Sequence, residues 1–251
     1  MTPTLPSAVS RLLGVHPLLA LAALVLCAGA AQAAGPTGLL NDTGQTQCYN
    51  ASDVAGPCDA ATTGDAGARP RQDGRFGRDA AAPAKVGGGA AGFDFTRICW
   101  NGDAEGSGTC TGTLVSNGTG TATGTPGTDW ACTKDNVTNL IWSLQTQSAT
   151  WNAATVPTYP DAGHNTPSRC GFATGWRLPT RRELLSIVHN GTSNPAIDGS
   201  YFPGTHSTYY WTSDTYAPNP SVARIVYFVN GGTDADYETG TGFVRLVRSG
   251  Q

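Results

Sequence analysis

Three carboxylates near the end of the chain form a candidate calcium site. Asp234, Asp236 and Glu238 fall within five consecutive residues, and calcium prefers carboxylate oxygens on flexible loops. Their spacing does not match the calcium-binding loop of an EF-hand, so the alternative interpretation is the solvated tip of an acidic hairpin. Calcium is the one cofactor that the sequence suggests, and both interpretations stay open.

Arginine and tyrosine side chains form a second candidate site, for a ligand that carries negative charge. The candidate ligand-binding residues are Arg181, Arg182, Tyr209, Tyr216 and Arg224, and Arg245, Arg248 and Tyr237 could extend the same face. A sulfated polysaccharide needs such a basic face, and tyrosine rings offer surfaces for stacking. The alternative is a solvated helix face, and the net charge of −3 does not favour a polyanion.

Catalytic chemistry has little support in the sequence. The histidines beyond the N-terminal region are His164, His189 and His206, and none lies beside a serine or cysteine in a known nucleophile motif. Gly-x-Ser-x-Gly and His-Glu-x-x-His, which mark serine hydrolases and zinc peptidases, are both absent from the sequence. We therefore expect no catalytic residues, with an enzyme as the alternative.

Composition excludes several classes of protein. Charged residues are 13% of the 251 residues, about half of the roughly 25% that is usual in soluble domains. A net charge of −3 lacks the basic surface that nucleic-acid binding requires. Low charge and abundant glycine are typical of proteins outside the cytoplasm.

The N-terminus has the features of a secretory signal peptide. Arg11 is the only charged residue among the first 41, an apolar run follows at 18–27, and Ala31 and Ala33 fit the small-x-small cleavage rule. The apolar run is shorter than the roughly 20 residues of a membrane-spanning helix, which is the alternative. We expect residues 1–33 to be removed, leaving a periplasmic, secreted or cell-surface protein with no later transmembrane segment.

Six cysteines remain after that cleavage, and an even number in an exported chain indicates disulfides. Six cysteines allow 15 pairings, and short loops favour Cys48–Cys58, Cys99–Cys110 and Cys132–Cys170. Metal ligation is the alternative, but no Cys-x-x-Cys pair is present and no histidine has zinc-finger spacing from a cysteine.

The mature chain divides into an N-terminal segment and one domain. Residues 34–92 are poor in large apolar side chains, and 60–92 are mostly Ala, Gly, Asp, Arg and Pro, so we expect a flexible linker there. Large apolar residues concentrate in 93–251, which we expect to fold as one domain with an exposed Gly/Thr-rich loop at 102–128.

Local patterns within 93–251 predict an α+β fold with short antiparallel strands around one or two helices. Thr180 and Glu183 form a capping box, and the apolar positions up to Asn190-Gly191 predict a helix of about three turns. Apolar and β-branched runs predict strands, and one short helix is expected within the rest. The expected strands are 140–144, 209–213, 223–229 and 243–247, and the short helix is 151–154.

Several ordered segments resemble one protein family. They are TGQTQCY at 43–49, WACTKDNVTNLIW at 130–142, CGFATGWRLPTRREL at 170–184, FP at 202–203, YWTS at 210–213 and VRLVR at 244–248. These segments are similar to the Lcl C-terminal domain family, although Asn139 stands where the family more usually has glycine. The resemblance implies a C-type-lectin-like fold similar to that of formylglycine-generating enzymes, and it strengthens the pairing of Cys132 with Cys170.

The expected function is non-catalytic recognition or adhesion outside the cytoplasm. The resemblance to an adhesin domain implies a carbohydrate ligand, sulfated polysaccharide in particular, or a protein partner of the cell envelope. The alternatives are an enzyme or enzyme accessory related to formylglycine-generating proteins, whose oxygen-activating cysteine pair is not matched, and a structural subunit of a surface appendage. A fold alone does not decide among them.

Overall fold

The structure is a computed structural model of the 251-residue chain. It describes residues 41–50, 52, 54–56, 58, 72–114, 129–155 and 169–250. All of these belong to one unit, Ala33–Gln251. The expected signal peptide, His164 and much of the Gly/Thr-rich loop lie outside the described residues.

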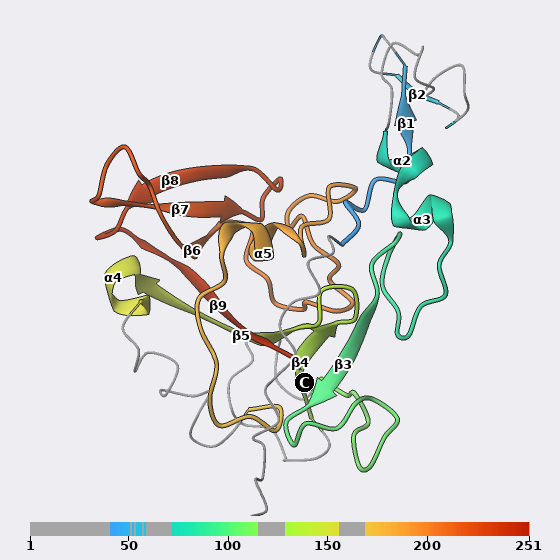
Figure 1. Ribbon diagram of the computed structural model, residues 1–251, viewed down its shortest axis with the longest axis horizontal. Helices are drawn as coiled ribbons and strands as arrows, with labels where there is room; N and C mark the ends of the chain where they lie inside the picture. Colours follow the sequence, from blue (N-terminus) through green and yellow to red (C-terminus); the bar gives the residue numbers. More distant parts are fainter. Residues whose placement is uncertain are drawn as a thin grey trace, which may run out of the picture. The chain divides into compact units, whose positions relative to one another are not determined.

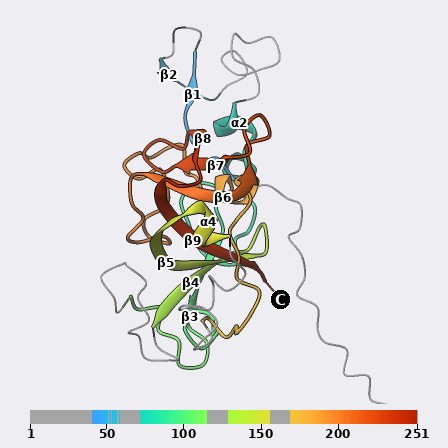
Figure 2. The ribbon, with the colours of Figure 1, turned by 90° about the vertical axis from the view of Figure 1, so that its left-hand side faces the viewer.

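Seven strands form one sheet in the order β3-β4-β5-β9-β6-β7-β8, which Figure 2 shows from the lower to the upper end of the view. The strands are β3 (Phe95–Cys99), β4 (Trp130–Asp135), β5 (Leu140–Thr150), β6 (Tyr209–Thr215), β7 (Val222–Tyr227), β8 (Thr233–Tyr237) and β9 (Thr241–Ser249) (Figure 1). All neighbours pair antiparallel except β6 and β9, which pair parallel through Tyr210 and Phe243. The protein is therefore mostly β-sheet with a few short helices.

The central strands carry a hydrophobic core on each face of the sheet. Trp142 belongs to one buried cluster and its neighbour Ile141 to the other, and Tyr210 and Trp211 divide in the same way. Successive side chains of a strand point to opposite faces, so a strand that is covered on both sides buries its side chains at every position. Hence β5 is buried without interruption at 140–145 and extends six residues beyond the expected end at 144.

The capping box forms as predicted, but the helix that it begins is much shorter than three turns. α5 covers only Arg181–Leu185, with the Thr180 hydroxyl accepting from the Glu183 N–H and the Glu183 carboxylate accepting from the Thr180 N–H. At Ser186 the side-chain hydroxyl donates to the Glu183 carbonyl, and the next amides bond three residues back. This tighter winding ends the α-helix, because it replaces the i→i−4 bonds that would continue it.

The Trp-Arg-Leu signature before α5 also has a structural explanation. Trp176 and Leu178 are buried in the core, and Arg177 between them donates to both carboxylate oxygens of Glu183, at 2.8 and 2.6 Å. Burial alone would raise the pKa of Glu183, but the bonds from Arg177 and Thr180 outweigh it and lower that pKa. The segment is therefore held to the start of α5 by one carboxylate.

Three disulfides join Cys48 to Cys58, Cys99 to Cys110, and Cys132 to Cys170. These are the pairs that loop length favours. Cys48 lies in β1 (Cys48–Tyr49), which pairs with β2 (Ala55–Gly56) in a separate two-stranded sheet.

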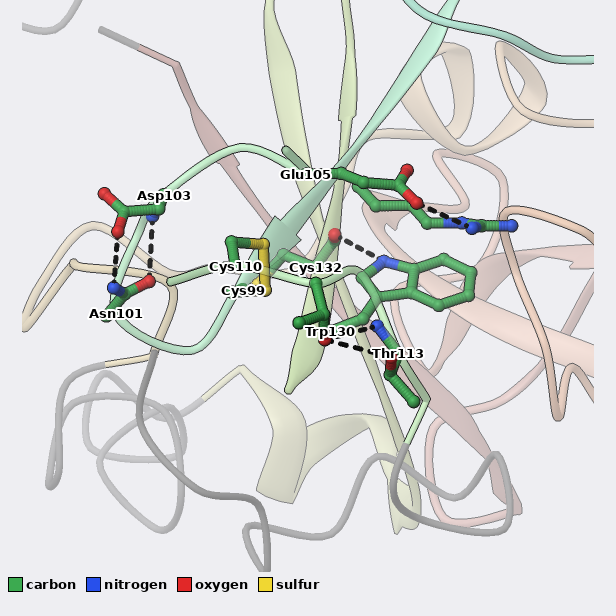
Figure 3. The surroundings of a disulfide bond; sticks show 10 residues. Cys99, Asn101, Asp103, Glu105, Cys110, Thr113, Trp130 and Cys132 are labelled. Carbon is green, nitrogen blue, oxygen red and sulfur yellow. Dashed lines mark hydrogen bonds and ion pairs between the residues drawn. A yellow bond between two sulfur atoms is a disulfide. The ribbon is translucent and has the colours of Figure 1, made fainter. Parts of the chain in front are cut away.

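The described part of the Gly/Thr-rich loop is anchored to the sheet beside Cys99–Cys110 (Figure 3). Trp130 donates its indole N–H to the Cys132 carbonyl and its backbone N–H to the Thr113 carbonyl. The Arg97 guanidinium lies 4.6 Å from the Trp130 ring and forms an ion pair with Glu105 at 3.1 Å. Residues 102–114 of the expected exposed loop are thus held by a disulfide, an ion pair and backbone bonds.

Residues 72–92 do not form the flexible linker that their composition predicts. They contain α2 (Asp73–Phe76) and α3 (Arg78–Ala81), and their amides bond to aspartates. Asp42 accepts from Arg78, Asp94 from Val86 and Gly87, and Asp198 from Ala90. Carboxylates that accept backbone N–H bonds hold a segment in place without apolar burial, and amino-acid composition does not reveal such bonds.

Among the described residues, the remaining helix is α4 (Trp151–Ala154), which forms at the predicted position. Within the described residues, no helix has the length and apolar character needed to cross a membrane.

Candidate functional site

A pocket of about 270 Å³ lies on strands β7 and β8. It brings together residues that the sequence assigned to two different candidate sites. Its lining residues are Tyr216, Val222, Arg224, Asp234, Ala235, Asp236 and Tyr237. Tyr216 and Arg224 were predicted to bind a ligand, with Tyr237 as an extension of the same face. Asp234 and Asp236 were predicted to bind calcium. We call it the β7–β8 pocket.

The pairing register of β7 and β8 determines which side chains project from the same face of these two strands at the β7–β8 pocket. Arg224 is directly opposite Ala235, and Val222 is opposite Tyr237. Opposed residues of an antiparallel pair share a face, so Arg224 and Tyr237 project from the same side of the sheet. The backbone N–H of Tyr216 donates to the Val222 carbonyl at 2.9 Å, and the Arg224 guanidinium carbon lies 4.4 Å from the centre of the Tyr216 ring.

Asp234 and Asp236 line the β7–β8 pocket at the free edge of β8. At the two ends of the β7–β8 pair, the Tyr227 N–H donates to the Gly232 carbonyl and the Glu238 N–H donates to the Ser221 carbonyl. Because successive amides of a strand point in opposite directions, the N–H groups of Ala235 and Tyr237 point away from β7. Asp234 accepts the N–H of Ala235 at 2.9 Å, and Asp236 accepts that of Tyr237 at 2.8 Å. Each carboxylate therefore lies at the outer edge and keeps acceptor capacity for another donor.

Tyr209 borders this pocket without lining it. Its hydroxyl donates to the Thr241 carbonyl at 2.9 Å. Burial, followed by a hydrogen bond with Asp236 and the charge of that carboxylate, raises the pKa of Tyr209 to about 12. The hydroxyl therefore stays protonated at neutral pH.

Arg181 and Arg182 lie elsewhere. They line a second cavity, of about 460 Å³, between α5 with the residues that follow it and the segment 41–43. We call it the α5 cavity. None of its lining residues is shared with the β7–β8 pocket, so the structure does not bring the candidate arginines onto one face.

Arg245 and Arg248 are not part of a basic face, which corrects the expected extension. Arg245 is completely buried and donates to the carbonyls of Ser143 and Leu144, where the β5–β9 register shifts. Arg248 donates to the Thr174 carbonyl at 3.0 Å and stacks on Phe172. Both guanidinium groups satisfy backbone carbonyls that the sheet and loops leave unpaired, because arginine offers five donors in a fixed fork.

The expected calcium site at 234–238 is not assembled. The segment is a strand rather than a loop or a hairpin tip, and Glu238 lies beyond its end and outside the β7–β8 pocket. In the part of the chain that is described, three carboxylates that could hold a cation meet instead at Asp42, Asp73 and Asp79, with oxygens within 4.8 Å of one another. No local motif announces this group, because 31 residues separate its first two members.

Neither described histidine of the domain forms catalytic geometry. His189 is buried, and its Nδ1 accepts from the Gly191 N–H at 3.0 Å. The His206 ring stacks on Phe243, with 4.0 Å between ring centres. All six described cysteines are in disulfides. The described residues thus offer stacking and hydrogen-bonding groups but no activated nucleophile.

The comparisons with known proteins agree with the resemblance that the sequence segments show. The model of the Lcl C-terminal domain family matches residues 131–248. This stretch contains β5 to β8, most of β4 and β9, the Cys132–Cys170 disulfide and the β7–β8 pocket. A search of curated proteins gives no match. Residues 131–248 thus match the Lcl C-terminal domain family, the same family that the sequence segments resemble.

Proposed function

We propose that this protein is an exported, non-catalytic recognition domain that binds carbohydrate in the β7–β8 pocket. The observation that carries the proposal is the stack of Arg224 on Tyr216 beside Asp234 and Asp236. An aromatic face with planar donors and acceptors at its rim suits a sugar ring, which has apolar C–H faces and hydroxyl groups around its edge.

Charge favours a neutral sugar over a sulfated one. Arg224 makes no ion pair within the described ranges, and two carboxylates line the same pocket, so a sulfate group would meet one cation and two anions. Hydroxyl groups can donate to the carboxylates and accept from the guanidinium without that repulsion. A neutral glycan with adjacent hydroxyl groups is therefore the best chemical fit.

Export is supported by the disulfides and by the N-terminal sequence. Three disulfides stabilise the unit, and such bonds persist in oxidising compartments. The basic residue, apolar run and Ala-x-Ala site at 11–33 fit a signal peptide. A C-type-lectin-like architecture, implied by the family resemblance, would be consistent with recognition, although a fold alone does not assign a ligand.

The proposal is tested with a glycan array on the purified mature protein, followed by titration calorimetry on any neutral glycan that binds. Tyr216→Ala and Arg224→Ala are expected to weaken binding at least tenfold, whereas Tyr216→Phe retains it because the stacking ring remains. Arg182→Ala is the matched control, since Arg182 is exposed and lies in the other cavity.

Two results would overturn the proposal. One is an array that gives no neutral glycan and only sulfated ones. The other is a neutral hit whose affinity falls equally in Arg182→Ala and Arg224→Ala, because that would place the ligand outside the β7–β8 pocket.

A further inference from the structure

The α5 cavity has fixed walls on both sides. The Asn190 N–H donates to the Thr43 carbonyl at 2.7 Å, and the Gln45 side chain donates to the Asn190 carbonyl at 3.1 Å. On the other side, the Asp214 carboxylate accepts the backbone N–H of Arg181 at the start of α5. A volume of about 460 Å³ lies within the range of pockets that hold small molecules.

Two unpaired cations stand at the α5 cavity. Arg181 and Arg182 are both exposed, and neither guanidinium has a hydrogen-bond or ion-pair partner among the residues that the structure describes. Arg177, by contrast, is bound to Glu183. Two guanidinium groups that line one cavity and have no internal partners can bind one carboxylate through charge-assisted hydrogen bonds.

The rest of the lining is suited to an aliphatic chain. Leu185, which is half-buried, and Val188, which is buried, are among the residues that line the cavity, together with the two arginines, whose stems are aliphatic. Placing an aliphatic group there removes apolar surface from water on both molecules. The α5 cavity thus combines a cationic mouth with an apolar interior.

Acidic groups next to the α5 cavity limit the charge that a ligand can carry. Asp42 lines the cavity, and its carboxylate lies within 4.8 Å of those of Asp73 and Asp79. These three carboxylates would repel a chain of sulfate or phosphate groups but would affect a single distal carboxylate less, because Coulomb repulsion grows with each added charge. The site therefore favours one negative charge over many.

From these features we propose that the α5 cavity binds a monoanionic organic acid with an aliphatic body. Its carboxylate pairs with Arg181 and Arg182, and its hydrocarbon chain packs on Leu185 and Val188. The proposal is independent of the carbohydrate proposal, because the two sites share no lining residue.

The test is a titration of the ¹⁵N-labelled mature protein with octanoate, monitored by amide chemical shifts, with octan-1-ol as the uncharged probe of similar shape. We expect saturable shifts at 41–43 and 181–190, with a dissociation constant on the order of 1 mM, as is usual for a ligand of about ten non-hydrogen atoms. Octan-1-ol should bind at least tenfold more weakly, and added salt should weaken octanoate binding.

Variants separate the charged contact from simple apolar binding. The double variant Arg181→Ala/Arg182→Ala should lose at least tenfold in octanoate affinity, and Arg224→Ala should leave it unchanged. Both arginines are exposed, so the unliganded spectrum of the double variant should show an intact fold. Equal affinity for octan-1-ol, a loss below twofold in the double variant, or shifts that map outside the α5 cavity would each overturn the proposal.

Discussion

Removing the Glu183 carboxylate should destabilise the domain measurably, because this one group serves two segments. It accepts the Thr180 N–H at 2.8 Å, which would otherwise be an unpaired amide at the start of α5. It also accepts two bonds from Arg177, which lies in the segment that packs Trp176 and Leu178 into the core. Glu183→Ala loses both sets of bonds, whereas Glu183→Gln keeps an acceptor for the Thr180 amide.

The expected cost follows from the exposure of the groups. Loss of the reciprocal cap costs about 1 kcal/mol. The Arg177 side chain is 42% exposed, so water partly replaces its lost bonds, and we assign about 1 kcal/mol to the ion pair. Glu183→Ala should therefore lower the free energy of unfolding by about 2 kcal/mol, and Glu183→Gln by about 1 kcal/mol.

Urea unfolding followed by tryptophan fluorescence measures both variants, with unchanged m-values showing that the transition stays two-state. Arg182→Ala in the same helix is the matched control and should change the free energy by less than about 0.5 kcal/mol. A cost below about 0.5 kcal/mol for Glu183→Ala would refute the reasoning, because it would show that neither the cap nor the Arg177 pair stabilises the fold.

The pH dependence gives a second test of the same carboxylate. Its pKa is lowered in the folded state, so its contribution is present above the unfolded pKa of about 4.5 and is lost as the pH falls through the folded value. Glu183→Gln should remove this component of acid destabilisation, whereas identical acid profiles for both proteins would contradict the assigned role.

Two further predictions concern the disulfides and Tyr209. Cys132 and Cys170 are both completely buried, whereas Cys58 is half-buried. Limited reduction followed by alkylation and mass spectrometry should therefore find the Cys48–Cys58 disulfide reduced first. Earlier reduction of Cys132–Cys170 would be inconsistent with this burial. Because the pKa of Tyr209 is raised from 10.0 to about 12, its contribution to stability is complete below pH 10 and is lost as the pH rises towards 12. The pKa of Tyr201 is also raised by burial, so ultraviolet titration should show more than one late-ionising tyrosine, of which Tyr209→Phe removes one. A variant with the same titration curve as the parent would disprove the assignment.

Local signals in the sequence were sufficient for elements that depend on near neighbours. The capping box needs only Thr180 and Glu183, and the α4 helix and the core strands follow from short-range patterns. The predicted length of α5 was wrong, because the apolar positions that suggested a longer helix continue to Val188. Those side chains are buried in a non-helical segment as well as they would be in a helix.

The β7–β8 pocket could be predicted only in part. Tyr216 and Arg224 were predicted as ligand-binding residues, and both line this pocket. β8 was not predicted as a strand, because its sequence TDADY lacks the apolar alternation of a half-buried strand. As an edge strand it packs little apolar surface, so pairing with β7 alone determines its structure. The group Asp42, Asp73 and Asp79 depends on tertiary folding, which no spacing within the sequence reveals.

The aspartates of β8 also affect how this protein can associate with other chains. An exposed edge strand normally offers a row of N–H groups that can recruit a further strand. Here the outward amides of Ala235 and Tyr237 are already bonded to the side chains of Asp234 and Asp236. At the opposite edge, β3 is covered by bridges to Gly88 and Ala104. Growth of the sheet by strand addition is therefore disfavoured at both ends, which limits edge-to-edge aggregation of the folded protein.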